Sequence, residues 1–217
     1  MKYVLLTGAS GGLGLHLSEY LMNQGYYVIM LYNNHKDEVE ELANKYKNGM
    51  IYKIDLTNDD EIIKLHDYLT QNNIRINILI NNAAIDHTSD LEDKTKEDFI
   101  NVFTMNTYVP YKLMQTIEYD TCVNISSENA IDTYDEVTVE YDVSKAGLNM
   151  LNNIFRRIHP NRIYNVIAFG WLDTKMNKID EDIKKYIEFV PFDKACKEIE
   201  KLFDKQIEDI VIVRKWL

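Results

Sequence analysis

Short apolar runs alternate with amphipathic stretches along the whole chain. The runs are nearly continuous in apolar residues, as expected of strands that are buried on both faces of a parallel sheet. Six runs predict strands and one more is a candidate strand: Tyr3–Leu6, Tyr27–Leu31, Met50–Ile54, Ile76–Ile80, Cys122–Ile125, Ile163–Ala168 and, as the candidate, Ile210–Val213.

Helical patterns occupy the intervals between these runs. The predicted helices are Gly12–Gln24, Lys36–Tyr46, Asp59–Gln71, Lys96–Ile117 and Val139–Ile158, and Asn58 or Asp59 caps the third of them. Strands that alternate with helices pair in parallel through right-handed crossovers. The pattern therefore predicts the α/β class, with a doubly wound parallel sheet of about seven strands and helices on both faces.

Composition and charge narrow the class of protein. The chain of 217 residues has no linker rich in Pro, Gly or Ser, so residues 1–217 are predicted to form a single domain. With 24 Lys and Arg against 35 Asp and Glu, the net charge of −11 disfavours a nucleic-acid partner. No apolar run is as long as a signal-peptide core or a membrane span. Cys122 and Cys196 have neither disulfide nor metal-ligand spacing, which predicts a cytoplasmic protein with no metal site and no membrane partner.

A glycine-rich loop joins the first predicted strand to the first predicted helix. Its sequence is Thr7-Gly8-Ala9-Ser10-Gly11-Gly12-Leu13-Gly14. Glycines allow a tight turn and a close approach of the backbone to a pyrophosphate, toward which the helix directs its free N–H groups. The alternative is a glycine-rich turn without a ligand. Because the loop lies at the first strand–helix crossover, the sequence favours a Rossmann-like dinucleotide-binding fold.

Tyr141 and Lys145 lie four residues apart on a predicted helix, and therefore on one face of it. A nearby ammonium lowers the pKa of a phenol, which ordinarily is near ~10, and makes the phenol a better acid–base catalyst at neutral pH. Such spacing also arises by chance on amphipathic helices, so the pair gains meaning only from the rest of the chain.

The ordered motifs resemble those of the short-chain dehydrogenase/reductase family, in its single-domain, 3-oxoacyl-reductase-like form. The glycine loop is similar to the family's G-x-x-x-G-x-G, and Tyr141 and Lys145 match its Y-x-x-x-K. The other matching segments are Asn81-Asn82-Ala83-Ala84, Asn106 in the long helix, Ser126-Ser127 and Asn165 to Thr174. The resemblance covers about residues 1–176, which makes coincidence implausible.

The resemblance implies hydride transfer between a nicotinamide and a carbonyl or alcohol, with four catalytic residues. Ser127 would polarise the substrate oxygen and Tyr141 would donate the proton. Lys145 would hold the nicotinamide ribose and favour the phenolate. Asn106 would interrupt the long helix to hold a water that links Lys145 to solvent. Strand alternation should bring only one of Ser126 and Ser127 to the cleft. An ordinary strand-end hydroxyl and a helix-surface amide are the alternatives for Ser127 and Asn106.

The same resemblance implies a set of cofactor contacts. Asp55 would bond the adenine ring, with helix capping as its alternative role, and Thr174 and the backbone of Leu172 would hold the carboxamide. The full set is Gly8, Ser10, Gly11, Gly12, Leu13, Gly14, Tyr32, Asn33, Asn34, Asp55, Leu56, Asn82, Ala83, Ala84, Tyr141, Lys145, Leu172 and Thr174.

The residues after the second strand bear on the choice of cofactor. An acid there would bind the ribose hydroxyls of NAD(H), but the chain has Tyr32-Asn33-Asn34-His35-Lys36. The lack of an acid favours NADP(H) over NAD(H), with Asn33, Asn34 and either His35 or Lys36 as donors. No Arg is present, and Gly11 stands where NADP-preferring relatives often place a basic residue.

The chain departs from the family pattern chiefly at its C-terminal end. Phe169-Gly170 replaces Pro-Gly, and Ala84 replaces a glycine. Only 41 residues follow Met176, so the substrate segment, about residues 171–207, is short and its lid small or absent. This puts in doubt the tetramer contacts that relatives make through the last strand. A homodimer through the two long helices is still predicted.

The loop between Ser127 and Tyr141 is acidic, with Glu128, Asp132, Asp135, Glu136 and Glu140. The simplest interpretation is a solvated loop. If it lines the cavity mouth, it disfavours an acidic carrier protein and favours a neutral or cationic carbonyl. Candidate apolar walls of the pocket are Tyr134, Trp171 and Met176.

The predicted function is hydride transfer between NADP(H) and a small carbonyl or secondary alcohol, with Tyr141 as acid and base. One alternative within enzymes is a 3-oxoacyl-thioester reductase. An alternative of another class is a regulatory protein that binds the dinucleotide without catalysis.

Overall fold

The computed structural model describes residues 1–133, 135–174, 176 and 181–215. Its strands form one parallel sheet in the order β3-β2-β1-β4-β5-β6-β7. They are β1 (Tyr3–Leu6), β2 (Tyr27–Tyr32), β3 (Gly49–Lys53), β4 (Ile78–Asn81), β5 (Thr121–Ser127), β6 (Ile163–Phe169) and β7 (Val211–Val213). The order reverses between β1 and β4, where a doubly wound sheet opens a crevice for ligands.

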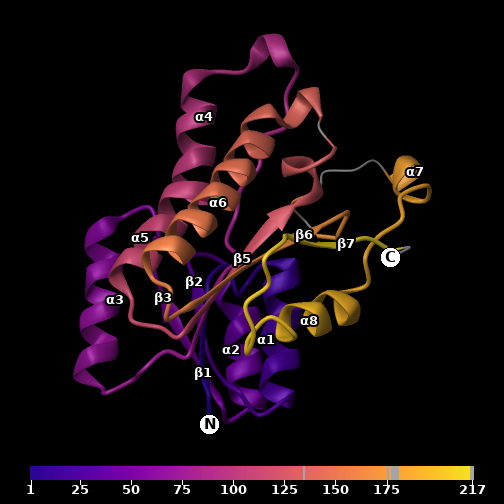
Figure 1. The fold of residues 1–217 in the computed structure, drawn as a ribbon. Helices are drawn as coiled ribbons and strands as arrows, with labels where there is room; N and C mark the ends of the chain where they lie inside the picture. Colours follow the sequence, from indigo (N-terminus) through magenta and orange to yellow (C-terminus); the bar gives the residue numbers. More distant parts are fainter. Residues whose placement is uncertain (134, 175, 177–180, 216–217) are drawn as a thin grey trace.

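Helices cover both faces of the sheet (Figure 1). One face carries α1 (Gly12–Asn23), α2 (Lys36–Lys45) and α8 (Phe192–Glu200), and the other carries α3 (Asp59–Gln71), α5 (Val109–Thr116) and α6 (Val139–Ile158). The remaining α-helices are α4 (Lys96–Phe103), which runs beside α6, and the short α7 (Glu181–Lys184). The predicted fold class, with seven parallel strands, is therefore confirmed.

The pleat of the strands divides the apolar side chains between two cores. Val4 and Leu6 of β1 face α1, whereas Leu5 between them packs with the residues of α3 and α5. All three are fully buried. Near-continuous apolar runs are thus required because each strand contributes to both cores.

The long helix predicted over Lys96–Ile117 is broken in the structure. A π-helical turn, η2 (Thr104–Tyr108), separates α4 from α5. Pro110 has no N–H to donate to the carbonyl of Asn106, four residues earlier, so a regular α-helix cannot continue there. The predicted interruption at Asn106 therefore lies where a proline removes the backbone donor.

The structure also bears on smaller sequence predictions, which concern the cap of α3, the two cysteines and membrane-spanning helices. The Asn58 side chain, and not that of Asp59, caps α3 by accepting a hydrogen bond from the N–H of Asp60. Cys122 and Cys196 are buried and free. None of the helices in the described part of the chain is long and apolar enough to cross a membrane.

Candidate active site

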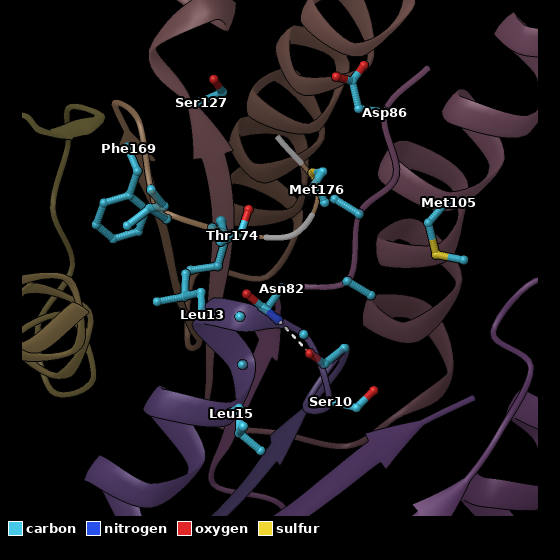
Figure 2. Close-up of a pocket in the computed structure, with 18 of the residues that line it drawn as sticks. Ser10, Leu13, Leu15, Asn82, Asp86, Met105, Ser127, Phe169, Thr174 and Met176 are labelled. Carbon is cyan, nitrogen blue, oxygen red and sulfur yellow. Dashed lines mark hydrogen bonds between the residues drawn. The ribbon is translucent and has the colours of Figure 1, made fainter. Parts of the chain in front are cut away.

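A cavity of about 780 Å³ opens at the carboxyl ends of the parallel strands (Figure 2). Its walls come from the glycine loop after β1, the segments after β2 and β4, the end of β5 and the residues that follow β6. In Figure 2, Ser10 and Leu15 lie at one end of the view, whereas Ser127 and Asp86 lie at the other. Figure 2 places Thr174 and Asn82 between the two ends. The cavity therefore connects the glycine loop to the predicted catalytic residues.

The glycine loop is packed too closely for side chains at two positions. Gly8 has φ +64°, and a Cβ there would lie 2.8 Å from the Cα of Ala83. A Cβ on Gly14 would lie 2.1 Å from the carbonyl oxygen of Gly8. Gly11 is the N-cap of α1 and provides no side-chain hydrogen bond. The first N–H groups of α1 thus remain directed at the cavity, the arrangement that binds phosphate.

Asn82 and Thr7 fasten the loop after β4 to the glycine loop. The Thr7 hydroxyl oxygen accepts hydrogen bonds from the N–H groups of Asn82 and Ala83, each at 2.9 Å. The Asn82 Nδ2 donates to the carbonyls of Thr7 at 2.9 Å and Gly8 at 3.2 Å (Figure 2). Asn82 therefore shapes the cofactor loop through its own hydrogen bonds.

Tyr141, Lys145 and Ser127 meet at the other end of the cavity. Tyr141 and Ser127 both line the cavity, and the Ser127 side chain is close enough to have a lowering effect on the pKa of Tyr141. Lys145 Nζ lies 5.6 Å from the centre of the Tyr141 ring. Lys145 is 2% exposed and donates to the carbonyl oxygen of Ile125 at 2.8 Å. The sheet end and the first turns of α6 thus bring together three of the four residues predicted to be catalytic.

Burial shifts both ionisable members of this group. It raises the pKa of Tyr141 well above its usual value, with a further increase from the charge of Asp86 and a smaller opposing effect from the hydrogen bond with Ser127. Burial lowers the pKa of Lys145 to about 8. The pKa of Tyr141 is thus raised in this geometry, because desolvation of the phenolate outweighs the effects that lower it.

Asn106 lies behind these residues and does not line the cavity. It is fully buried, and its Oδ1 accepts a hydrogen bond from the N–H of Ile85 at 2.9 Å. Its Nδ2 donates to the carbonyl of Ile85 at 2.9 Å and to the hydroxyl of Ser144 at 3.0 Å. The alternative of a helix-surface amide is therefore wrong, since Asn106 ties the loop after β4 to α6.

Ser126 is also among the residues that line the cavity, but its hydroxyl is buried and has no hydrogen-bond partner. Ser127, in contrast, accepts a hydrogen bond from the N–H of Asn129 at 3.3 Å. The expectation that only one of the two serine hydroxyls reaches the cleft is therefore not contradicted.

Most of the predicted cofactor residues line the cavity. They are Gly8, Ser10, Gly11, Gly12, Leu13, Gly14, Tyr32, Asn33, Asn34, Leu56, Asn82, Ala83, Ala84, Tyr141, Lys145, Leu172 and Thr174. Asp55 does not line it, and its Oδ1 accepts hydrogen bonds from the N–H and hydroxyl of Thr57 at 2.9 and 2.7 Å. Thr174 packs on the glycine loop, because a Cβ on Gly12 would lie 2.9 Å from its methyl group.

The segment after β2 supplies Asn33, Asn34 and His35 to the cavity, and Lys36 is instead bound to Glu40 at 2.7 Å. Glu38 of α2 also lines this end. Sequence reasoning missed Glu38 because it lies past the position where the family carries an acid, one helical turn into α2.

The loop between Ser127 and Tyr141 is not simply solvated. Glu140 is fully buried and pairs with Lys94 at 2.8 Å. Glu128 and Asp132 both bind Arg214, at 2.7 and 2.6 Å. The solvated interpretation is wrong for Glu140 and Glu128, because cations far away in the sequence bind them where they have little exposure. Asp132 is paired with Arg214 but remains exposed. Of the predicted apolar walls, Trp171 and Met176 line the cavity, and Tyr134 is outside the described residues.

Asp86 and Met105 are cavity residues that were not singled out from the sequence. Asp86 lies at the Ser127 end of the cavity, and Met105 projects from the π-helical turn (Figure 2). Asp86 follows the Asn-Asn-Ala-Ala motif by two residues, which is the signal that could have drawn attention to it.

Comparisons with known proteins agree with this geometry. The family model described as short chain dehydrogenase matches residues 2–184. The 3-oxoacyl-[acyl-carrier-protein] reductase FabG of Buchnera aphidicola is 28% identical over 93% of this chain and 87% of its own length. Benzil reductase ((S)-benzoin forming) of Bacillus cereus is 29% identical over 95% of this chain and 90% of its own length.

Among solved structures, the Pseudomonas aeruginosa RhlG/NADP active-site complex has a TM-score of 0.90. It is 19% identical in sequence, and the match covers 99% of this chain and 95% of that chain, which supports the fold. On the family match and the fold together, this chain belongs to the short-chain dehydrogenase/reductase family and is an NAD(P)-dependent oxidoreductase.

Proposed function

We propose that this chain transfers a hydride between NADP(H) and a small carbonyl or secondary alcohol, with Tyr141 as the acid and base. The observation that carries the proposal is the group of Ser127, Tyr141 and the buried Lys145, which lines one end of a cavity that begins at the glycine loop. A cleft that joins a phosphate-binding loop to an acid–base group fits a dinucleotide and a second, reacting molecule.

The residues present fit a dinucleotide. Gly8 and Gly14 have no room for a side chain, so the glycine loop presents backbone atoms at these positions. The N-terminus of α1 is open toward the cavity. Beyond the loop, Thr174 and Leu172 lie in position to contact a carboxamide. When bound, the nicotinamide supplies or accepts the hydride.

In the reductive direction, Ser127 donates a hydrogen bond to the substrate oxygen and so stabilises the negative charge that grows there. Tyr141 gives its proton to the same oxygen. Its raised pKa keeps the phenol protonated at neutral pH, which suits the donor role. In the oxidative direction the same groups act in reverse.

Lys145 and Asn106 act from behind the phenol. Lys145 has a pKa of about 8, so its side chain is mostly an ammonium at pH 7. This ammonium donates hydrogen bonds toward the ribose and toward Tyr141. Both side-chain amide protons of Asn106 already donate hydrogen bonds. Its backbone carbonyl receives no hydrogen bond from Pro110, which has no N–H. This carbonyl is therefore the group that holds a relay water.

NADP(H) is favoured over NAD(H) because amides, and no acid, follow β2 directly. Asn33, Asn34 and His35 line the end of the cavity where the 2′-phosphate would lie. The structure of the Pseudomonas aeruginosa protein contains NADP. Glu38 lines the same part of the cavity, and its negative charge disfavours a 2′-phosphate there. A substitution of Glu38 therefore tests the preference for NADP(H).

A 3-oxoacyl-thioester reductase is the second candidate activity. The similarity to the Buchnera aphidicola 3-oxoacyl-[acyl-carrier-protein] reductase favours it. Cavity-lining carboxylates at Asp86, Glu128 and Asp135 weigh against an acidic carrier protein. The alternative of another class is a protein that binds the dinucleotide without catalysis. The clustering of Ser127, Tyr141 and Lys145 weighs against this alternative.

An apolar face on α4 and α6 supports a homodimer. Ile100 of α4 and Val143, Met150 and Ile154 of α6 are exposed, with Met150 61% exposed. The α6 residues recur on one side of the helix, and α4 lies beside it (Figure 1). We propose that two copies pack these helices together in the cytoplasm. Met150→Glu should convert the dimer to a monomer in light scattering after gel filtration.

The test of the activity joins binding and turnover. NADPH and NADH are titrated by fluorescence, and a panel of ketones, aldehydes and 3-oxoacyl thioesters is then assayed with wild type and Ser127→Ala. The proposal expects NADPH binding in both proteins and a loss of turnover of about 10²-fold or more in the variant. Cofactor binding with no carbonyl turnover by wild type would support the binding-only alternative.

A further inference from the structure

Asp86 places a carboxylate at the reacting end of the cavity. It lies on the loop after β4 and lines the same cavity as Tyr141, at the end of the view in Figure 2 that also holds Ser127. Its charge raises the pKa of Tyr141. A substrate whose carbonyl oxygen meets Ser127 and Tyr141 therefore has the Asp86 side chain close to its remaining atoms.

The Asp86 carboxylate is short of hydrogen-bond donors. Its Oδ1 is buried and has no partner, and its Oδ2 has a contact of 3.5 Å from the hydroxyl of Thr88, with the backbone N–H of His87 also acting on the carboxylate. No ion pair is found for it among residues 1–133, 135–174, 176 and 181–215. Buried carboxylate oxygens normally have donors, so the position calls for one from a bound molecule.

The nearest cation is already engaged. Lys94 Nζ donates to the carbonyls of His87 and Val137 at 2.6 and 2.7 Å and to Glu140 at 2.8 Å. These three acceptors use the three protons of the ammonium. Lys94 therefore fixes the loop that carries Asp86 without neutralising Asp86 by a direct contact.

The cavity wall also contains apolar side chains. Met105, Trp171 and Met176 are among them, and they provide no strong donor for a carboxylate apart from the Trp171 indole. Burial among such groups raises the pKa of Asp86, with a further increase from Glu140 and Asp142 and opposing effects from the His87 backbone and Lys94. An apolar ketone would leave the carboxylate desolvated and unpaired.

We infer that Asp86 is a specificity-determining residue, which accepts a hydrogen bond from a hydroxyl or ammonium group carried by the substrate beside its carbonyl. The inference rests on the proposed carbonyl reduction and names its substrate class: hydroxy or amino ketones. A polar site rejects an isostere that lacks the matching donor, because its own polar group is then left unpaired.

A matched pair of small ketones tests the inference. Hydroxyacetone and 2-butanone differ only in a hydroxyl against a methyl group, and aminoacetone adds a cationic arm. Wild type is expected to have a kcat/KM for hydroxyacetone at least about tenfold above that for 2-butanone. The same ketones are compared in binding to the protein with NADPH by ligand-observed NMR, so that selectivity is measured even without turnover.

Two variants separate the two donor classes. Asp86→Leu should bring the ratio of kcat/KM for hydroxyacetone to kcat/KM for 2-butanone to within about twofold. Asp86→Asn keeps an acceptor oxygen but has no negative charge. If the donor is a hydroxyl, the variant should retain its kcat/KM for hydroxyacetone. If the donor is an ammonium, the variant should lose its kcat/KM for aminoacetone. Asp90→Asn is the matched control, because Asp90 is on the same loop, is exposed and does not line the cavity.

The outcomes are distinguishable from failure of the proposed function. If wild type reduces or binds both ketones equally and Asp86→Leu leaves the ratio unchanged, the inference is overturned while carbonyl reduction stands. If NADPH binds and no ketone is reduced, the proposed function fails. The NMR comparison then still decides whether Asp86 selects a donor-bearing ligand.

Discussion

Arg214, just beyond β7, binds Glu128, the residue that follows Ser127 in the sequence. Its Nε lies 2.7 Å from Glu128 Oε2, and its Nη2 lies 2.6 Å from Asp132 Oδ1. The side chains of Arg214 and Glu128 are only 20% and 15% exposed. The C-terminal segment, though short, thus supports the loop that carries a predicted catalytic serine.

Arg214→Gln should weaken this support. Breaking a partly buried ion pair on two carboxylates should lower the free energy of unfolding by about 1–2 kcal/mol and reduce kcat several-fold, because the Ser127 loop loses its anchor. Thermal unfolding and steady-state kinetics check both. Arg157→Gln, on an exposed position of α6, serves as control. Equal effects of the two substitutions would contradict the anchoring role.

Asn106→Ala should be strongly destabilising. It leaves the partly buried N–H and C=O of Ile85 and the buried hydroxyl of Ser144 without their side-chain partner, which should cost about 2–4 kcal/mol. Urea unfolding measures the loss. Thr104→Ala, a helix position whose hydroxyl only bonds the Ile100 carbonyl, should cost less than about 1 kcal/mol. A neutral Asn106→Ala variant would show that the amide is not the link between the two segments.

Lys145→Met should lower the activity of the protein and raise its stability at pH 7. Because burial lowers the pKa of Lys145 from 10.5 to about 8, the unfolded chain binds this proton more tightly than the folded chain does. Below about pH 8 the folded state therefore carries a penalty of roughly 3 kcal/mol, which shrinks as pH rises toward 10.5. The variant should be more stable than wild type at pH 7, and the difference should fade by pH 10.

Unfolding of both proteins between pH 6 and pH 10 gives this difference directly. A variant that is less stable than wild type at pH 7 would mean that the hydrogen bond to the Ile125 carbonyl outweighs desolvation of the ammonium. Turnover by the variant should fall at all pH values, since no donor remains for the ribose.

Glu38→Gln should shift the cofactor preference toward NADP(H). Removing a half-buried negative charge from the wall next to Asn33 and Asn34 should raise the ratio of NADPH to NADH affinity a few-fold at low salt, and less at high salt. Fluorescence titration measures both affinities. Glu41→Gln makes the same charge change on an exposed position of α2 and should leave the ratio unaltered. An unchanged ratio in Glu38→Gln would place the 2′-position away from this wall.

The sequence predicted the sheet well because each buried strand is marked by its own residues. The strand predicted at Ile76–Ile80 is observed two residues later, at Ile78–Asn81, yet its place in the sheet is unaffected. The cluster of Ser127, Tyr141 and Lys145 was also predicted, from the resemblance to the short-chain dehydrogenase/reductase family and from the four-residue spacing of Tyr141 and Lys145 on one helix. Pro110 marks the break in the long helix, since a missing N–H is a local property.

Other features depend on residues that meet only in the folded chain. The burial of Glu140 against Lys94 and the anchoring of Glu128 by Arg214 join segments 46 and 86 residues apart. No local pattern predicts such pairs. The raised pKa of Tyr141 has the same origin, because desolvation depends on the packing around the phenol.

The most direct test of the central claim is kcat for carbonyl reduction by Tyr141→Phe at saturating NADPH. The substitution removes only the hydroxyl, so cofactor affinity should stay within about threefold of wild type. A general acid contributes about 10²–10⁴-fold, and kcat should fall by that factor. Turnover within a few-fold of wild type would contradict the assignment of Tyr141 as the proton donor.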